Sequence, residues 1–261
     1  MSIRSKVLAA AATLTLVSGV GAAGALTAGT ASAATPSCGN ACINVFSKEF
    51  GTHHQPNFVV DVLRQGEKVG QPIILFRTAN FDPAEDFSVA FQGTVADFFA
   101  AGLVSSAVAL HYGCLPSIFP GGSCFNAKTN PHGFPNDFAF ENEYAPFGVD
   151  SGLCLGVAAT AFNDEGVTLQ PCGVSAKTVW IVDTFDSPVT LFNGFVPLIN
   201  GSDTNFSHPF VLTYPNNSVP TDKPRPQLVV TNLTGFQNGP GPVLGTVNVN
   251  QLWGATFGVL P

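Results

Sequence analysis

The side chains that could catalyse hydrolysis are present in this sequence, but their spacing matches no hydrolase pattern. There is no Gly-x-Ser-x-Gly sequence, which would place a serine nucleophile on a sharp turn. Glycoside hydrolysis needs two facing carboxylates, and nothing in the spacing of Asp82, Glu85 and Asp86 singles them out as such a pair. Phosphate-loop and dinucleotide fingerprints are also missing. We therefore expect no catalysis and no cofactor, and keep a secreted hydrolase, with its site on loop insertions, as the weakest alternative.

Histidines and cysteines are the other candidates for chemistry. His53 and His54 are adjacent, so on a strand they would face opposite ways and could not easily share a metal ion. A zinc site combining them with Cys38-x3-Cys42 is possible in ligand type, but export to an oxidising compartment favours disulfides, and we expect no metal. The even count of six cysteines predicts disulfides with fifteen possible pairings, and the simplest scheme joins the neighbours Cys38/Cys42, Cys114/Cys124 and Cys154/Cys172.

The first 33 residues have the three parts of a secretory signal. Arg4 and Lys6 supply the positive start, Val7–Leu26 is a long apolar stretch, and Ala31-Ser32-Ala33 is a small-residue cleavage pattern. The alternative is an uncleaved anchor, since the apolar stretch approaches the ~20 residues that span a bilayer. We expect cleavage after Ala33, an extracellular protein of residues 34–261, and no membrane association afterwards.

The composition restricts the partners of this exported chain. Losing Arg4 and Lys6 takes the formal charge from −7 to −9, and the remaining basic residues form no cluster. Such a chain has no electrostatic footprint for nucleic acid or anionic lipid. Charged residues are only 10% of the sequence, so Asn, Ser, Thr and Gly must cover much of the surface.

Short runs rich in Val, Ile, Phe and Thr, bounded by turn-forming residues, predict an all-β fold. Val95–Leu110 is the one stretch with helix-forming composition, and we expect a helical turn followed by a strand there. The predicted strands are Phe58–Leu63, Pro72–Arg77, Phe138–Tyr144, Val167–Gln170, Val179–Val182, Phe210–Tyr214, Gln227–Asn232 and Leu252–Val259.

A gapped repeat organises these strands into three units. Each unit has a strand ending in valine (Val62, Val157 or Val230), a glycine 8 or 9 residues later, and an aromatic 25, 23 and 23 residues after that valine. One unit cannot bury its apolar face alone, so the three aromatics are expected to meet in one core. These residues are Phe87, Trp180 and Trp253.

At these positions the sequence resembles the ricin-type β-trefoil lectins. The family's units run Cys-Leu-Asp-Val, Gly, Val-x-Leu-x-x-Cys and Gln-x-Trp, which Cys154–Val157, Val167–Cys172 and Gln251–Trp253 approach. Residues 144–157 and 166–183 also resemble a group of secreted actinobacterial proteins without an established activity. The resemblance implies a single β-trefoil domain over 34–261, with units at about 42–90, 138–183 and 208–261 and long insertions at about 91–137 and 184–207.

The resemblance also implies a sugar site built from an Asp, an aromatic residue and the Gln-x-Trp region. The first unit keeps Asp61 and Phe76, with Glu85 at the Gln position, whereas the second has Gly156 and Gln170 and the third has no matching Asp. Asp61 could instead accept backbone hydrogen bonds in a turn, and Phe76 could belong to the core. We expect a secreted, non-catalytic carbohydrate-binding protein for a glycan or cell-wall polysaccharide. The alternative is a trefoil that serves as an envelope or protein-interaction module.

Overall fold

The computed structural model describes most of the chain after the predicted signal peptide. Three features discussed above lie outside the described residues. They are the predicted signal, the pair His53/His54 and the four cysteines Cys38, Cys42, Cys114 and Cys124. Within the described part, no helix has the length and apolar character needed to cross a bilayer. The described ranges are 43–50, 57–79, 82–113, 137–182, 194–215, 226–235 and 247–257.

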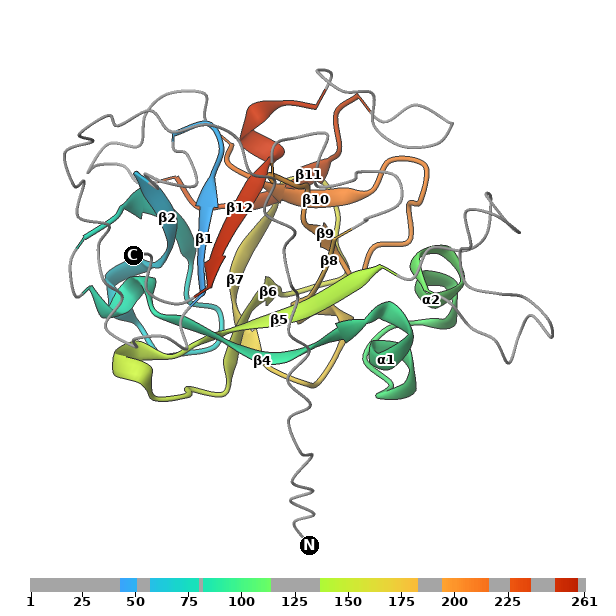
Figure 1. Ribbon diagram of the computed structural model, residues 1–261, viewed down its shortest axis with the longest axis horizontal. Helices are drawn as coiled ribbons and strands as arrows, with labels where there is room; N and C mark the ends of the chain where they lie inside the picture. Colours follow the sequence, from blue (N-terminus) through green and yellow to red (C-terminus); the bar gives the residue numbers. More distant parts are fainter. Residues whose placement is uncertain are drawn as a thin grey trace, which may run out of the picture. The chain divides into compact units, whose positions relative to one another are not determined.

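Within the described ranges, twelve strands follow one another in three groups of four (Figure 1). The first group is β1 (Ile43–Ser47), β2 (Phe58–Val62), β3 (Ile73–Arg77) and β4 (Phe87–Thr94); the second is β5 (Phe138–Tyr144), β6 (Leu153–Val157), β7 (Glu165–Pro171) and β8 (Val179–Val182); the third is β9 (Ile199–Asn200), β10 (Phe210–Thr213), β11 (Val229–Asn232) and β12 (Trp253–Phe257).

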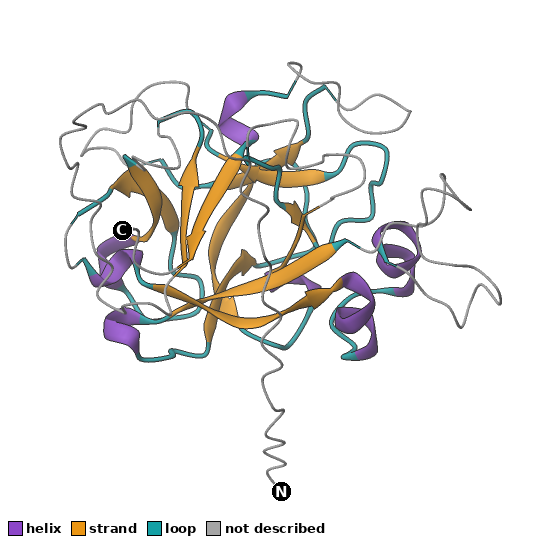
Figure 2. Cartoon of the chain, in the orientation of Figure 1, coloured by secondary structure: helices purple, strands orange, loops and turns teal. Residues whose placement is uncertain are grey.

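The helical segments of the part that the structure describes are short and lie between the strands (Figure 2). They are the α-helices α1 (Val95–Ala100) and α2 (Ser106–Tyr112) and the 3-10 turns η2 (Leu63–Gln65), η3 (Pro83–Glu85), η4 (Pro146–Gly148), η5 (Ala176–Thr178) and η7 (Val249–Gln251).

The strand pairing repeats three times, which identifies the fold. In each group the first strand pairs with the second and the second forms a hairpin with the third. The groups join through β4–β5, β8–β9 and β12–β1, all antiparallel. The hairpins also meet one another, through β7–β11 and through bridges at Pro72 and Ile74. The first and last strands of the groups, β1, β4, β5, β8, β9 and β12, form a barrel, and the three hairpins cap it. This arrangement is a β-trefoil, and the predicted fold class is confirmed.

One hydrophobic cluster contains Phe87, Trp180 and Trp253, which begin or nearly begin the last strand of each group. Each is at most 1% exposed. The indole nitrogen of Trp180 donates to the carbonyl oxygen of Leu155 at 2.9 Å. The indole nitrogen of Trp253 donates to the carbonyl oxygen of Leu212 at 2.8 Å. The two tryptophans therefore occupy equivalent places, and the same hydrogen bond gives each buried N–H a partner.

The region Val95–Leu110 differs from the prediction of a helical turn and a strand. It forms two helices, because Thr94 caps α1 in a reciprocal pair of bonds with Asp97 and Ser105 accepts from the Val108 backbone to begin α2. Gly102, at φ +75°, turns the chain between them. β4 continues to Thr94, so the departure from the trefoil begins later than the predicted residue 91.

The third unit begins earlier than predicted. β9 and the bridge from Val196 to Trp253 lie inside the supposed insertion 184–207. The sequence repeat also places Leu228–Val230 at the second strand of a unit, whereas this segment enters the third strand, β11, and the second strand is β10. A strand of two residues has no periodicity to detect, which explains why the sequence pattern missed β9.

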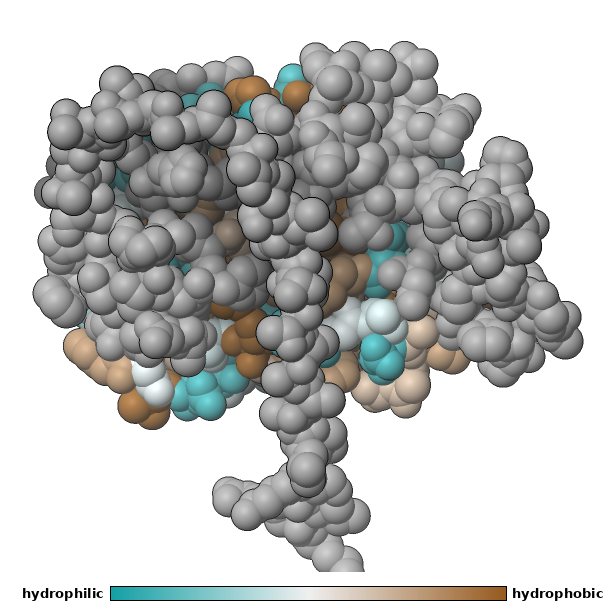
Figure 3. Space-filling model, in the orientation of Figure 1, coloured by the Kyte–Doolittle hydropathy of each residue, from teal (hydrophilic) through white to brown (hydrophobic). Residues whose placement is uncertain are grey.

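Apolar side chains also occur on the surface of the described part. Figure 3 shows hydrophobic residues next to hydrophilic ones where this face of the described part is visible. The large hydrophobic side chains that are exposed lie in different turns and elements; they are Val69, Phe138, Phe147, Val149, Phe162, Val174 and Val249.

Candidate functional site

The β2–β3 hairpin places the two residues expected to bind sugar on one face. Asp61 is opposite Ile74 and Val59 is opposite Phe76. Because side chains alternate between the two faces of a strand, Asp61 and Phe76 are diagonal neighbours on the same face. Phe76 is half-buried, but Asp61 is only 2% exposed.

A short turn brings further carboxyl groups to Asp61. Asp82 begins η3, where its side chain accepts from the Ala84 backbone at 3.0 Å and Pro83 supplies the helical backbone angle. Oxygens of Asp61, Asp82 and Glu85 all lie within 4.8 Å of one another. Asp82 is half-buried and is the least enclosed of the three. The sequence interpretation left Asp82 out of the site, although an Asp-Pro pair before a turn is a recognisable cap signal.

Hydrogen bonds from the chain itself hold this carboxyl cluster. Glu85 accepts from the Ala79 backbone at 2.7 Å, and Asp82 accepts from the side chain of Gln65 at 3.1 Å. The neighbouring Asp86 points elsewhere, because its carboxylate accepts from the Phe147 backbone at 2.9 Å and so joins the first unit to the second. The cluster therefore consists of Asp61, Asp82 and Glu85.

Burial controls the charge of this cluster. Loss of hydration raises the pKa of Glu85 to about 9, and the charges of Asp61, Asp82 and Asp86 act in the same direction, against the bond from Ala79. At neutral pH Glu85 is therefore a neutral acid that can donate a hydrogen bond, as a glutamine can. Asp61 and Asp82 remain as the hydrogen-bond acceptors.

The same oxygens set a limit on metal binding. Within the described ranges, these three carboxyl groups form the one set of His, Cys, Asp or Glu side chains close enough to share an ion. Calcium takes six to eight oxygen ligands, more than these three carboxyl groups supply with one oxygen each. The cluster alone is an incomplete calcium site.

The matching position in the second unit is closed. Gly156 stands where Asp61 stands, and a Cβ added there would lie 2.7 Å from the Lys177 carbonyl oxygen. Gln170, at the Phe76 position, donates to the hydroxyl of Thr168 at 2.8 Å. A disulfide joins Cys154 of β6 to Cys172 just after β7, closing this unit across its hairpin.

The third unit fills its own position with hydrogen bonds. Thr213 and Thr231 take the places of Asp61 and Phe76, and Gln251 takes that of Glu85. The amide nitrogen of Gln251 donates to Thr231 at 2.9 Å and to the carbonyl oxygen of Asn232 at 2.9 Å. Its oxygen accepts from the backbone of Thr234 at 2.8 Å. Only the first unit combines carboxylates with an aromatic side chain.

Three glutamates of the second unit stabilise turns. Glu141 accepts from Gly173 at 3.0 Å, Glu143 from Gly152 at 2.6 Å and Glu165 from Ala159 at 3.1 Å, in each case from the backbone N–H. These bonds satisfy loop backbone that the strands leave unpaired.

Comparisons with known proteins add little to this geometry. No family model matches the sequence, and no curated protein matches it. Among solved structures, a designed threefold-symmetric protein, ThreeFoil, is 10% identical with a TM-score of 0.47, covering 82% of this chain and 96% of its own. A mosquitocidal holotoxin is 14% identical with a TM-score of 0.45; the match covers 84% of this chain but only 17% of the toxin. The fold assignment accordingly rests on the strand pairing.

Proposed function

We propose that this protein is a secreted, non-catalytic carbohydrate-binding protein whose sugar site lies in the first unit. One observation carries the proposal: of three equivalent positions, the second has no room for a side chain and the third is occupied by Gln251. The first instead presents Asp61, Asp82 and Phe76 together.

The chemistry of the first unit suits a sugar. Carboxylate oxygens accept hydrogen bonds from vicinal hydroxyls, and a partly exposed aromatic face packs on the C–H surface of a sugar ring. Because Asp82 and Phe76 are the more exposed members, we assign the direct contacts to them. Asp61, nearly buried beside Glu85, then supports Asp82 from behind. This assignment differs from that of the ricin-type lectins, in which the Asp at the position of Asp61 holds the sugar.

A glycan array with the mature protein tests the proposal. Asp82→Asn and Phe76→Ala should each reduce binding to the recognised glycan by about tenfold or more, the effect of losing a charge-assisted hydrogen bond or a stacking surface. Asp164→Asn is the matched control, because it removes an exposed carboxylate from a turn of the second unit and should leave binding unchanged. Melting curves must show that all variants fold.

The outcome separates the alternatives. A folded protein that binds no glycan, or whose glycan binding survives both Asp82→Asn and Phe76→Ala, overturns the proposal. Specific capture of one protein together with a negative array would support the interaction module instead. Export is tested independently by sequencing the N-terminus of protein recovered from culture medium, which should begin at Ala34.

A further inference from the structure

A cavity of about 220 Å³ lies inside the barrel. Its lining comes from β1, β4, β5, β8 and β12 and from the segment that leads into β9. Phe138 begins β5 and Val182 ends β8, whereas the hairpins follow the other end of β5 and precede the other end of β8. The cavity therefore occupies the end of the barrel away from the three hairpins, and away from Asp61.

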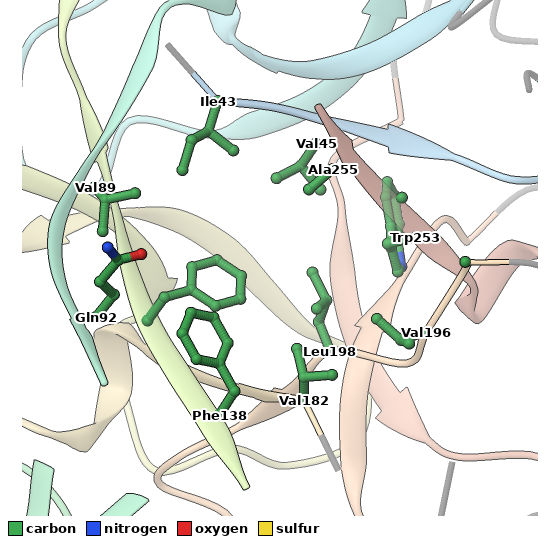
Figure 4. Close-up of a pocket in the computed structure, with 13 residues that line it drawn as sticks. Ile43, Val45, Val89, Gln92, Phe138, Val182, Val196, Leu198, Trp253 and Ala255 are labelled. Atoms are coloured by element: carbon green, nitrogen blue, oxygen red, sulfur yellow. The ribbon is translucent and has the colours of Figure 1, made fainter. Parts of the chain in front are cut away.

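The cavity wall is almost entirely apolar. Figure 4 shows Val89 and Gln92 on one side and Val45 and Trp253 on the other, facing a common space. Gln92 is the one lining residue in the described chain with an amide, and none of the lining residues is charged. The indole N–H of Trp253 is already bonded to Leu212.

Two phenylalanines form part of the wall. The rings of Phe138 and Phe140 are stacked, with centroids 6.1 Å apart and planes 25° apart. Phe138 is 38% exposed, and Phe140 is 7% exposed. An exposed phenylalanine at the edge of an apolar cavity costs hydration free energy that a bound apolar group would recover.

Size and polarity restrict the occupant. An apolar cavity of about 150 Å³ accommodates benzene, so this volume accommodates a benzene ring with a small substituent. Water needs two to four polar partners in such a place, and the described lining side chains offer only the amide of Gln92 besides the indole N–H of Trp253, which is already bonded. A single hydroxyl on the ligand matches this amide, whereas a charged ligand would lack a counter-charge.

We propose that the barrel end binds a small, uncharged aromatic molecule with one hydroxyl group, its ring between Trp253 and the Phe138/Phe140 pair and its hydroxyl at Gln92. This site is separate from the proposed sugar site and does not depend on it. It is closer in kind to the ligand cavities at the mouths of β-barrels than to a surface lectin site.

The two tryptophans make the proposal directly measurable. Trp253 lines the cavity and Trp180 does not, so Trp180→Phe leaves one fluorophore at the site and Trp253→Phe leaves one outside it. The probe is 4-bromophenol at a pH where its hydroxyl is neutral, because a bromine in contact with an indole quenches its fluorescence. We expect saturable quenching in Trp180→Phe and only weak, linear quenching in Trp253→Phe.

Blocking and polarity variants complete the test. Ala255 lines the cavity from an exposed position, so Ala255→Phe should fill the space without disturbing the fold and weaken binding by about tenfold or more. Val174→Phe, at a site 69% exposed and outside the lining, is the control and should bind normally.

Gln92→Leu should remove the preference for 4-bromophenol over bromobenzene. Linear quenching in Trp180→Phe, or saturable binding that Ala255→Phe leaves unchanged, overturns the proposal.

Discussion

Glu85 in the first unit occupies the place that Gln251 occupies in the third. Gln251 reaches the side chains of Thr213 and Thr231 with its amide nitrogen, and Glu85 lies against Asp61 at the position of Thr213. Because burial raises the pKa of Glu85 to about 9, the protonated acid can serve Asp61 as the amide serves the threonines. The proton on the Glu85 carboxyl group thus takes the role that the side-chain amide of Gln251 has in the third unit.

The first prediction concerns the pH dependence of stability. The folded pKa of Glu85, about 9, lies above its ordinary value of 4.5, so the folded state binds this proton more tightly than the unfolded state. The resulting stability is complete below about pH 4.5 and is lost as the pH rises towards 9. Glu85→Gln, which keeps an oxygen for the Ala79 backbone, should unfold at the same temperature as wild type near pH 4.5 and at a higher one at pH 8. Thermal scans across this range measure it.

Glu67→Gln is the control for that comparison, because Glu67 is an exposed carboxylate of the same unit. It should follow the wild-type curve. Parallel pH profiles of wild type and Glu85→Gln would contradict the protonated state of Glu85.

The indole hydrogen bonds predict a cost for an otherwise conservative change. Trp180→Phe removes the donor to Leu155 and leaves a void in a fully buried site, so we expect a loss of about 2 kcal/mol in unfolding free energy. Urea unfolding measures this loss. Phe162→Leu, at a position 53% exposed, should change stability by less than about 0.5 kcal/mol, and equal effects of the two substitutions would be inconsistent with this packing.

The Cys154–Cys172 disulfide should stabilise the second unit. It closes a loop with a sequence separation of 18, and constraining such a loop in the unfolded chain contributes about 3 kcal/mol. The double variant Cys154→Ala/Cys172→Ala should therefore show a lower urea midpoint while keeping the wild-type β-sheet spectrum. An unchanged midpoint would show that the bridge is energetically neutral.

Substitution of two glycines should cost different amounts of stability, because one added Cβ would meet backbone and the other a movable side chain. Gly156→Ala would place its Cβ 2.7 Å from the Lys177 carbonyl oxygen, which is backbone, and should destabilise by about 1–3 kcal/mol. Gly166→Ala would instead meet the amide end of Gln227, which can move, and should cost less. Calorimetry of both variants tests this order. For the same reason, Gly156→Asp should not create a sugar site in the second unit.

Much of the fold was predictable because trefoil units repeat locally. The cysteine-bracketed unit and the spacing to Trp180 identified β6, β7 and β8 with nearly their observed bounds, since strand pattern and turn chemistry are encoded within a few residues. β9 was not predictable, because its two residues are placed by pairing with β8 and β10 rather than by their own pattern. The helix α2 was missed because an interrupted Ala/Val/Ser stretch suits either structure until its caps are considered.

The sequence by itself determined the all-β class, two of the three repeat units and the placing of Asp61 and Phe76 on one hairpin face, and it predicts an export signal at the N-terminus. Only the tertiary structure decided that Asp82 joins Asp61 and Glu85, that Gly156 leaves no room for a ligand, and that Gln251 fills the third position. The physical reason is the sequence separation of the interactions: the alternation of side chains along a strand and the preferences of turn residues act between near neighbours in the chain. Burial, and with it the protonation of Glu85 and the cavity beside Trp253, depends on strands brought together from all three units.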